Sequence, residues 1–580
     1  MLPSRITILF IIFEFTWQIN ANFNCEHHKV VTTRYGRVRG CISKTLLEQR
    51  PIVSFTGIPY AKPPVGNRRF EQSVPPEPWN ATLDAFQYKN VCNQMEAGKP
   101  IGNEDCLYIN VFTPDTTFSK RLPVIFFIFG GGFYAGSANI YGPELLLDHD
   151  VILVTFNYRL GPFGFFSLGN RDYSGNLALK DQLLALKWVR DNIHSFGGDK
   201  TEITTHGWSA GCRSVSLHMA SPASQGLFNR AICFSASALI PWILSDVKDH
   251  RDIAKDFAIS HGFQPSNDQQ LIDYLKNVDA DKLSTLTNNS LPPPGTNEIY
   301  FGLPWGPVIE SASSKNPFLL SSPVNYFNKE NYGRSSMDTL IGYVDAESYV
   351  GISDVIQDPS LLAPFDKEFR VQLPLFGLNY SFSDLDYPLL SNEVRQFYFG
   401  NESVTTQVPQ LSSITNDLMS YPVHRAVKLQ SKVSCGRTFY YIFSVDLMLS
   451  RFKRLSNAKA HGLTGNSTHG DDIFYLFKIK NWDEIIAPGT YESLSLDSKE
   501  VSVIKMMTGI VANFATTGHP TLQDSPIDWK EVDKDEQDIN YVTITEEGLR
   551  AGVNPNCNNY AFWDKFFIKH QQRLGCSNCQ

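Results

Sequence analysis

The sequence predicts an α/β fold, a single large domain whose mostly parallel central sheet is flanked by helices. Residues 122–129 and 151–156 are continuous apolar runs rich in β-branched and aromatic side chains, as expected of strands buried on both faces. Apolar residues between Leu177 and Ile193 recur instead at roughly helical spacing. A strand candidate at 203–206 follows, so strand and helix alternate through the first half of the chain.

The first 21 residues are predicted to be a secretory signal. Arg5 supplies a positive charge, residues 6–17 an apolar run, and residues 19–21 a plausible cleavage site. A membrane anchor is the alternative, but Glu14 interrupts the run, which is shorter than the roughly 20 apolar residues that a span needs. We therefore expect a secreted protein without a transmembrane segment, with its enzyme domain at 22–570 and a short tail at 571–580.

A hairpin is predicted at residues 30–40, where β-branched residues flank a Tyr35-Gly36 turn. Cys25 and Cys41 bracket this hairpin and could be paired. The ten cysteines fit an oxidising compartment. Five N-x-Ser/Thr sequons also support secretion, and they lie at Asn80, Asn288, Asn379, Asn401 and Asn466.

The later part of the chain favours one domain rather than several. Residues 245–330 are polar and Pro-rich, and we interpret them as segments that extend above the sheet rather than as a linker between two domains. Residues 438–443 predict another core strand. The net charge of −8, from 51 Lys and Arg against 59 Asp and Glu, argues against a nucleic-acid-binding protein.

The pentapeptide at 207–211, Gly-Trp-Ser-Ala-Gly, matches the G-x-S-x-G nucleophile elbow. In that motif a sharp turn between a strand and a helix lifts a serine hydroxyl above the sheet, and the glycines avoid collisions with neighbouring elements. Residues 203–206 supply the strand, and residues 215–220 predict the helix. This context points to the α/β-hydrolase fold with Ser209 as the nucleophile.

Three glycines, Gly130, Gly131 and Gly132, directly follow the apolar run at 122–129. Consecutive glycines let backbone N–H groups turn into a pocket that no Cβ blocks. Esterases of this fold build an oxyanion hole from such a loop and from the amide after the nucleophile, here Ala210. We expect Gly131, Gly132 and Ala210 to hold the oxyanion, and an ordinary glycine-rich turn is the alternative.

A catalytic serine needs a base and an acid, which follow it in this fold in the order acid, then histidine. His461 and His469 are both followed by glycine, and their spacing alone does not separate them.

Four further segments resemble the type-B carboxylesterase family, which also contains the cholinesterases. They are Phe-Thr-Gly-Ile-Pro-Tyr-Ala-Lys-Pro-Pro-Val-Gly at 55–66, Glu-Asp-Cys-Leu-Tyr-Ile-Asn-Val at 104–111, Asn-Tyr-Arg-Leu-Gly at 157–161 and Phe-Gly-Gly-Asp at 196–199. The resemblance runs from about residue 31 to residue 567. It implies an α/β-hydrolase that hydrolyses small-molecule esters.

The resemblance also implies the catalytic residues. The histidine of the family opens a His-Gly-acid segment before an apolar strand, which falls on His469. The acid of the family is a Glu in a Gly-x-x-x-x-Glu segment, which falls on Glu347, with Asp345 as a nearby alternative. Ser209 would then form an acyl-enzyme, and no metal or organic cofactor is implied.

Several departures from the family bear on specificity. Phe129 stands where His or Tyr is usual, Ser348 replaces the Gly after the acid, and Trp208 replaces a common Glu. No aromatic residue lies between Cys92 and Cys106, where cholinesterases carry a Trp that binds quaternary ammonium groups. We expect a preference for neutral, apolar esters, in a pocket lined by Trp208, Phe133, Phe301 and Leu303.

Structural pairs follow from the same resemblance. They are the ion pairs Arg69–Glu104 and Arg159–Asp181, the disulfide Cys92–Cys106 and, less tightly aligned, the disulfide Cys435–Cys557. Cys212 and Cys233 are expected to be buried free thiols. Cys576 and Cys579 could link to each other or to another chain, so a homo-oligomer is a possible assembly.

Three other hypotheses compete with a carboxylesterase. A cholinesterase is disfavoured by the missing rim-loop Trp, and a non-catalytic adhesion or binding protein is disfavoured because the chain keeps the whole triad. The sequence does not separate a carboxylesterase from a lipase that acts at lipid surfaces.

Overall fold

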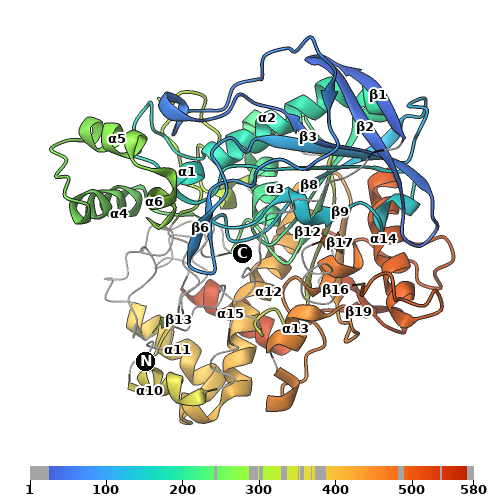
Figure 1. Cartoon of the computed structure of the whole chain (residues 1–580). Coiled ribbons are helices and arrows are strands. Elements are labelled where there is room, and N and C mark those ends of the chain that lie inside the picture. Colours follow the sequence, from blue (N-terminus) through green and yellow to red (C-terminus); the bar gives the residue numbers. More distant parts are fainter. Residues whose placement is uncertain are drawn as a thin grey trace.

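The computed structural model describes residues 25, 27–240, 244–286, 298–299, 305–327, 336–349, 352, 358–367, 369–371, 387–456, 458–480, 489–535 and 538–570. The predicted signal and C-terminal tail lie outside these ranges. A large mixed sheet crosses the molecule, and helices flank it (Figure 1). No helix in the described ranges is long and apolar enough to cross a membrane.

The sheet contains 13 strands among the described residues and is parallel in its centre. Its spatial order is β1 (His28–Thr33), β2 (Gly36–Lys44), β3 (Pro51–Pro59), β7 (Tyr108–Thr113), β10 (Ile152–Phe156), β8 (Leu122–Ile128), β11 (Gly198–Trp208), β12 (Arg230–Phe234), β14 (Asp338–Val344), β16 (Thr438–Phe443), β18 (Asn540–Thr545) and β19 (Gly548–Val553). Short β4 (Leu83–Asp84) pairs with β2. Neighbours from β1 to β10 and the pair β18–β19 are antiparallel.

The predicted strands and hairpin are confirmed. β8, β10 and β16 coincide with the apolar runs, and every residue of β10 is buried, as a central strand covered on both faces requires. β1 and β2 form the predicted hairpin. β11 begins at Gly198, earlier than the predicted strand at 203–206, because its first residues are polar and were not recognised as a strand. Its pairing with β8 shifts register between Gly198 and Ile203.

Two helices precede and follow the elbow. α2 (Leu177–Asn192) lies where the helical spacing predicts it. α3 (Ala210–Ala220) begins directly after Ser209, five residues before the expected start, in a stretch without apolar periodicity. The other helices are α1 (Gly161–Phe165), α4 (Val247–Ser260), α5 (Asp268–Asn277), α6 (Ala280–Ser284), α10 (Ala363–Lys367), α11 (Tyr387–Phe399), α12 (Val408–Val433), α13 (Arg451–Ser456), α14 (Lys499–Thr517) and α15 (Cys557–Lys569).

The polar segment at 245–330 forms α4, α5 and α6, which gather at one end of the molecule (green in Figure 1). A buried ion pair ties the end of this segment to α2, because Lys180 Nζ lies 2.6 Å from Glu310 Oε1. The other carboxylate oxygen of Glu310 accepts hydrogen bonds from the Asn176 side chain and from the N–H groups of Phe318 and Leu319. The end of the segment is thus packed against α2.

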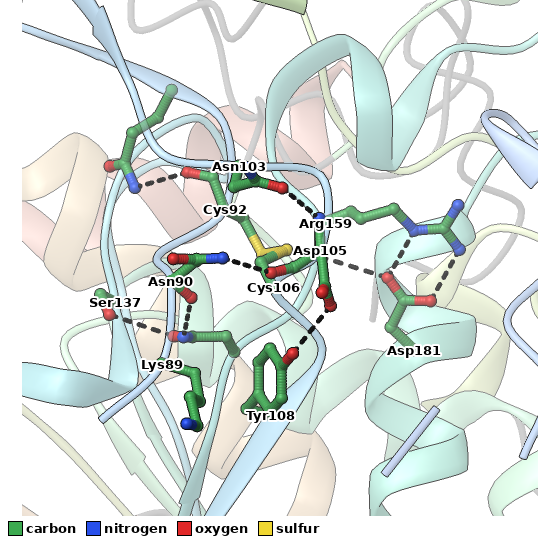
Figure 2. Close-up of a disulfide and its surroundings, with 12 residues drawn as sticks. Lys89, Asn90, Cys92, Asn103, Asp105, Cys106, Tyr108, Ser137, Arg159 and Asp181 are labelled. Atoms are coloured by element: carbon green, nitrogen blue, oxygen red, sulfur yellow. Dashed lines mark hydrogen bonds and ion pairs between the residues drawn. A yellow bond between two sulfur atoms is a disulfide. The ribbon is translucent and has the colours of Figure 1, made fainter. Parts of the chain in front are cut away.

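Figure 2 shows the disulfide between Cys92 and Cys106, which closes the loop expected from the resemblance. Asp105 organises the neighbourhood: its carbonyl accepts a hydrogen bond from Asn90, and its carboxylate accepts one from the Tyr108 hydroxyl at 2.9 Å. A second disulfide joins Cys25 and Cys41 around the hairpin. Cys212 and Cys233 are buried free thiols, as expected.

Both expected ion pairs form. Arg69 makes two hydrogen bonds to Glu104, at 2.6 and 2.5 Å. Arg159 makes two to Asp181, each at 2.7 Å, and Figure 2 shows this pair. Bidentate pairs of this kind fix orientation as well as charge. The second pair is almost wholly buried and holds the loop after β10 against α2.

The expected disulfide between Cys435 and Cys557 is wrong, since both are free thiols. Cys557 begins α15 beside Asp417, which accepts a hydrogen bond from Asn556 at 2.7 Å. From Asp417, α12 runs on to Val433, about 24 Å further along its axis, and Cys435 follows that end. A disulfide needs Cα atoms within about 7 Å, so the two cysteines are too far apart.

Candidate active site

Ser209 lies on a sharp turn between β11 and α3, with φ 54° and ψ −126°. Such a backbone is strained for a residue other than glycine and is held only by its surroundings. A Cβ on Gly207 would overlap the backbone of Gly211, and a Cβ on Gly211 would overlap the carbonyl of Ile128. The two flanking glycines are therefore required by close packing, as in a nucleophile elbow.

The structure brings Ser209, His469 and Glu347 together in one hydrogen-bonded row. His469 Nε2 lies 2.8 Å from Ser209 Oγ, and His469 Nδ1 lies 2.6 Å from Glu347 Oε2. The exposed fractions are only 3% for Ser209 and Glu347 and 5% for His469. An ionised carboxylate only accepts hydrogen bonds, so the imidazole donates from Nδ1 and is left to accept the serine proton at Nε2.

Glu347 is held by β14 and α12. Its Oε1 accepts the N–H of Val344 at 3.0 Å, and its own N–H donates to Asn416 Oδ1 at 2.8 Å. Ser348, which replaces the usual glycine, donates to the carbonyl of Ser412 on the same helix. Asn416 is distant from Glu347 in the sequence and belongs to no motif, so sequence reasoning had no signal for it.

Asp345, the alternative acid, does not contact His469 among the interactions of the described residues. Its carboxylate accepts the Ser444 hydroxyl at 2.7 Å and the N–H groups of Asn466 and Ser467 at 3.1 and 2.8 Å. Burial raises the pKa of Asp345, and these donors oppose that shift. Asp345 thus connects the loop after β14 to the loop that carries His469.

The glycine loop has the backbone that an oxyanion site requires. Gly131 has φ 116° and Gly132 has φ 61°, backbone angles that residues other than glycine rarely adopt. Within the described part of the chain, neither N–H donates to a protein acceptor. Ala210 is the first residue of α3, where helix N–H groups also lack intrahelical partners. These amides are available to a developing negative charge.

Two buried carboxyl groups follow the candidate base. Burial raises the pKa of Asp471 to about 7, although the N–H groups of Thr468 and Phe452 donate to it. Burial and the negative charge of Glu347 raise the pKa of Asp472 well above its usual value. These groups were not singled out in the sequence, although both lie in the His-Gly-acid segment.

The predicted substrate-pocket residues have different positions. The Phe133 ring packs 5.0 Å from that of Phe165 and is fully buried. Trp208 lies against His469. Phe301 and Leu303 lie outside the described residues. Phe129, directly before the glycine loop, stacks on Tyr158 at 4.3 Å, and its carbonyl accepts the Tyr158 hydroxyl at 2.7 Å.

Comparisons with known proteins identify the family of the chain. A sequence model of the carboxylesterase family matches residues 27–563. The chain is 34% identical to the juvenile hormone esterase of Tribolium castaneum over 85% of this chain and 84% of that protein. It is 30% identical to venom carboxylesterase-6 of Apis mellifera over 97% of this chain and 98% of that protein.

A solved structure is also similar. The crystal structure of juvenile hormone esterase from Manduca sexta, with OTFP covalently attached, superposes with a TM-score of 0.78 at 27% identity. The match covers 93% of this chain and the whole of that one. The fold is thus the α/β-hydrolase fold. The chain belongs to the carboxylesterase family and is a carboxylic ester hydrolase.

Proposed function

We propose that the chain is a secreted serine esterase that hydrolyses neutral, apolar esters through an acyl-enzyme intermediate. The observation that carries this proposal is the buried row of Ser209, His469 and Glu347, with hydrogen bonds of 2.8 and 2.6 Å. The N–H groups of Gly131 and Gly132, which donate to no acceptor among the described residues, support it, because they supply donors for a tetrahedral oxyanion.

In the acylation step, Ser209 Oγ attacks the ester carbonyl carbon while its proton passes to His469 Nε2. The carbonyl electron pair moves onto oxygen, where the N–H groups of Gly131, Gly132 and Ala210 hold the negative charge. Glu347 stays ionised, fixes the tautomer and stabilises the imidazolium. When the C–O bond to the alcohol breaks, the leaving oxygen takes the proton from Nε2.

Deacylation repeats the same steps with water. His469 removes a proton from the water as its oxygen attacks the acyl carbon, and the proton then returns to Ser209 as the acyl bond breaks. The related esterase solved with OTFP covalently attached supports a covalent route for this chain. Rapid acid quenching with p-nitrophenyl butyrate should therefore yield protein carrying one butyryl group on Ser209. Turnover without any such adduct would contradict the mechanism.

The preference for neutral esters is proposed from charge. The residue before the nucleophile is an uncharged Trp208, where a carboxylate would attract a cationic substrate in a partly dry site. The loop between Cys92 and Cys106 offers no aromatic face to a quaternary ammonium group. Both features weaken binding of choline esters relative to neutral esters of the same shape.

The test compares two substrates that differ only in charge. Butyrylthiocholine and 3,3-dimethylbutyl thiobutyrate have the same shape, but the second carries carbon in place of the ammonium nitrogen. We expect kcat/KM to be higher for the neutral ester. A higher value for butyrylthiocholine would favour the cholinesterase hypothesis instead.

Secretion is proposed from the predicted signal and from two disulfides, Cys25–Cys41 and Cys92–Cys106, which persist in oxidising compartments. Expression of the full chain in insect cells should place the enzyme in the medium with Asn22 as its first residue. Retention of the protein in the cell membrane, with the first 21 residues still attached, would contradict this proposal.

A further inference from the structure

Trp208 is the last residue of β11 and directly precedes Ser209. Its side chain is only 3% exposed. In the proposed mechanism it has no chemical step of its own, because an indole neither accepts nor transfers a proton here. Its surroundings nevertheless connect it to the glycine loop and to the loop that carries His469.

The indole fills the space between the glycine loop and the histidine loop. A Cβ on Gly130 would lie 2.9 Å from Cε2 of the indole, and a Cβ on Gly470 would lie 2.9 Å from its Cζ3. Real Cβ atoms do not come this close to another atom, so a side chain at either glycine would collide with the ring. Both loops therefore pack directly against the indole. Trp208 therefore separates the two loops at a fixed distance.

A hydrogen bond fixes the orientation of the ring. Trp208 Nε1–H donates to the hydroxyl of Tyr141 at 3.0 Å, with both groups buried. Tyr141 lies in β9 (Tyr141–Gly142), which pairs with β17 (Lys478–Ile479). Its ring also packs against Phe127 at 4.8 Å and Phe477 at 5.5 Å. The indole is thus anchored to a short two-stranded sheet, which packs through Tyr141 against Phe127 of β8 in the large sheet.

The anchored indole faces the candidate base. The ring centroids of Trp208 and His469 lie 5.4 Å apart, with 46° between the ring planes. A cation within about 6 Å of an indole is attracted by the π electrons, and most strongly where water is excluded. In the proposed mechanism His469 becomes a cation when it takes the serine proton, so this attraction acts as the transition state forms.

We propose that Trp208 is a positioning residue for ester hydrolysis, whose anchored indole aligns the His469 imidazole with Ser209 and stabilises its protonated form. This proposal rests on the proposed acyl-enzyme mechanism. Because the interaction strengthens as the proton moves, its loss lowers kcat and leaves KM almost unchanged. The range of free energies known for cation–π interactions corresponds to a loss of about 3- to 30-fold in kcat.

The experiment compares Trp208→Leu, Trp208→Phe and Tyr141→Phe with wild type, using p-nitrophenyl acetate and p-nitrophenyl hexanoate. Trp208→Leu removes the aromatic face, and we expect kcat to fall about 3- to 30-fold by the same factor for both esters, with KM within about twofold. Trp208→Phe keeps an aromatic face and should restore most of the loss. Circular dichroism checks that each variant folds.

A double-mutant cycle tests the anchor. Tyr141→Phe removes only the hydroxyl that accepts the indole N–H, so it should lower kcat in wild type and have no further effect in Trp208→Phe. Additive effects in the double variant would contradict the anchoring role. Unequal losses for the two esters, or a change confined to KM, would overturn the proposal and make Trp208 a substrate contact.

A readout without turnover separates this proposal from the proposed function. The downfield proton resonance of His469 Nδ1–H, identified by its loss in His469→Ala, should be sharp in wild type and broadened in Trp208→Leu. An unchanged resonance and unchanged kcat would contradict the role of Trp208 alone. A wild type that hydrolyses no ester would contradict the proposed function, and the resonance would still test whether Trp208 positions His469.

Discussion

The replacement of Glu347 by Gln tests how the acid directs the base. The two carboxylate oxygens of Glu347 have different partners: Oε2 accepts from His469 Nδ1 at 2.6 Å, and Oε1 accepts from the Val344 N–H at 3.0 Å. Gln has one acceptor and one donor at these positions. It therefore cannot accept both hydrogen bonds, whichever way its amide is turned.

Each orientation of the amide has a defined cost. If the amide oxygen faces His469, the amide NH₂ opposes the N–H of Val344, and a buried unsatisfied donor costs about 1–3 kcal/mol. If the NH₂ faces His469, the imidazole must accept at Nδ1 and carry its proton at Nε2, where it no longer accepts the proton of Ser209. Both orientations also lose the negative charge that stabilises the imidazolium. We expect kcat to fall about 10³- to 10⁴-fold, the size of effect known for a wrong tautomer.

Steady-state kinetics with p-nitrophenyl butyrate measure the effect, and Asp345→Asn is the matched control. This control makes the same carboxylate-to-amide change close by in the sequence, on a group that contacts Ser444, Asn466 and Ser467 rather than His469. We expect Asp345→Asn to lose less than about tenfold in kcat, because it affects the base only through its loop. A large loss in Asp345→Asn with near-normal Glu347→Gln would refute the assignment of the acid.

Three further predictions concern other parts of the chain. His469→Ala should lose several orders of magnitude in kcat because the base is removed, whereas His461→Ala should change kcat little, as steady-state assays will show. Glu310→Gln should lower the apparent Tm in thermal unfolding, because it leaves the buried Lys180 without a counter-charge, at a cost of about 3–5 kcal/mol. Asn466 should carry no glycan in peptide maps made with and without glycosidase, because its half-buried side-chain amide already donates a hydrogen bond within the fold.

Much of the fold was predictable because its central strands are buried on both faces. Such strands leave continuous apolar runs, and β8, β10 and β16 lie on the runs that predict them. The first part of β11 was missed because it is polar and partly exposed, so its sequence resembles a loop. The start of α3 was missed because small residues around an elbow carry no helical periodicity.

The site was predictable where a motif fixes the chemistry locally. The elbow and glycine loop have spacings that follow from backbone sterics, and the structure places Ser209 and Gly131 as those motifs require. Asn416 and Tyr141 were not predictable, because each acts through one contact with a residue far along the chain. The pairing of Cys435 with Cys557 was wrong because it rested on a loose alignment with the family, which contains no information about the distance between the two residues in this chain.

The most direct test of the central claim is covalent labelling of the nucleophile. An organophosphate reacts with an activated serine, so intact-protein and peptide mass spectrometry should find one adduct per chain, on Ser209. Ser209→Ala should show neither this adduct nor turnover of p-nitrophenyl butyrate. An adduct on a different residue, or full hydrolysis by Ser209→Ala, would contradict the account.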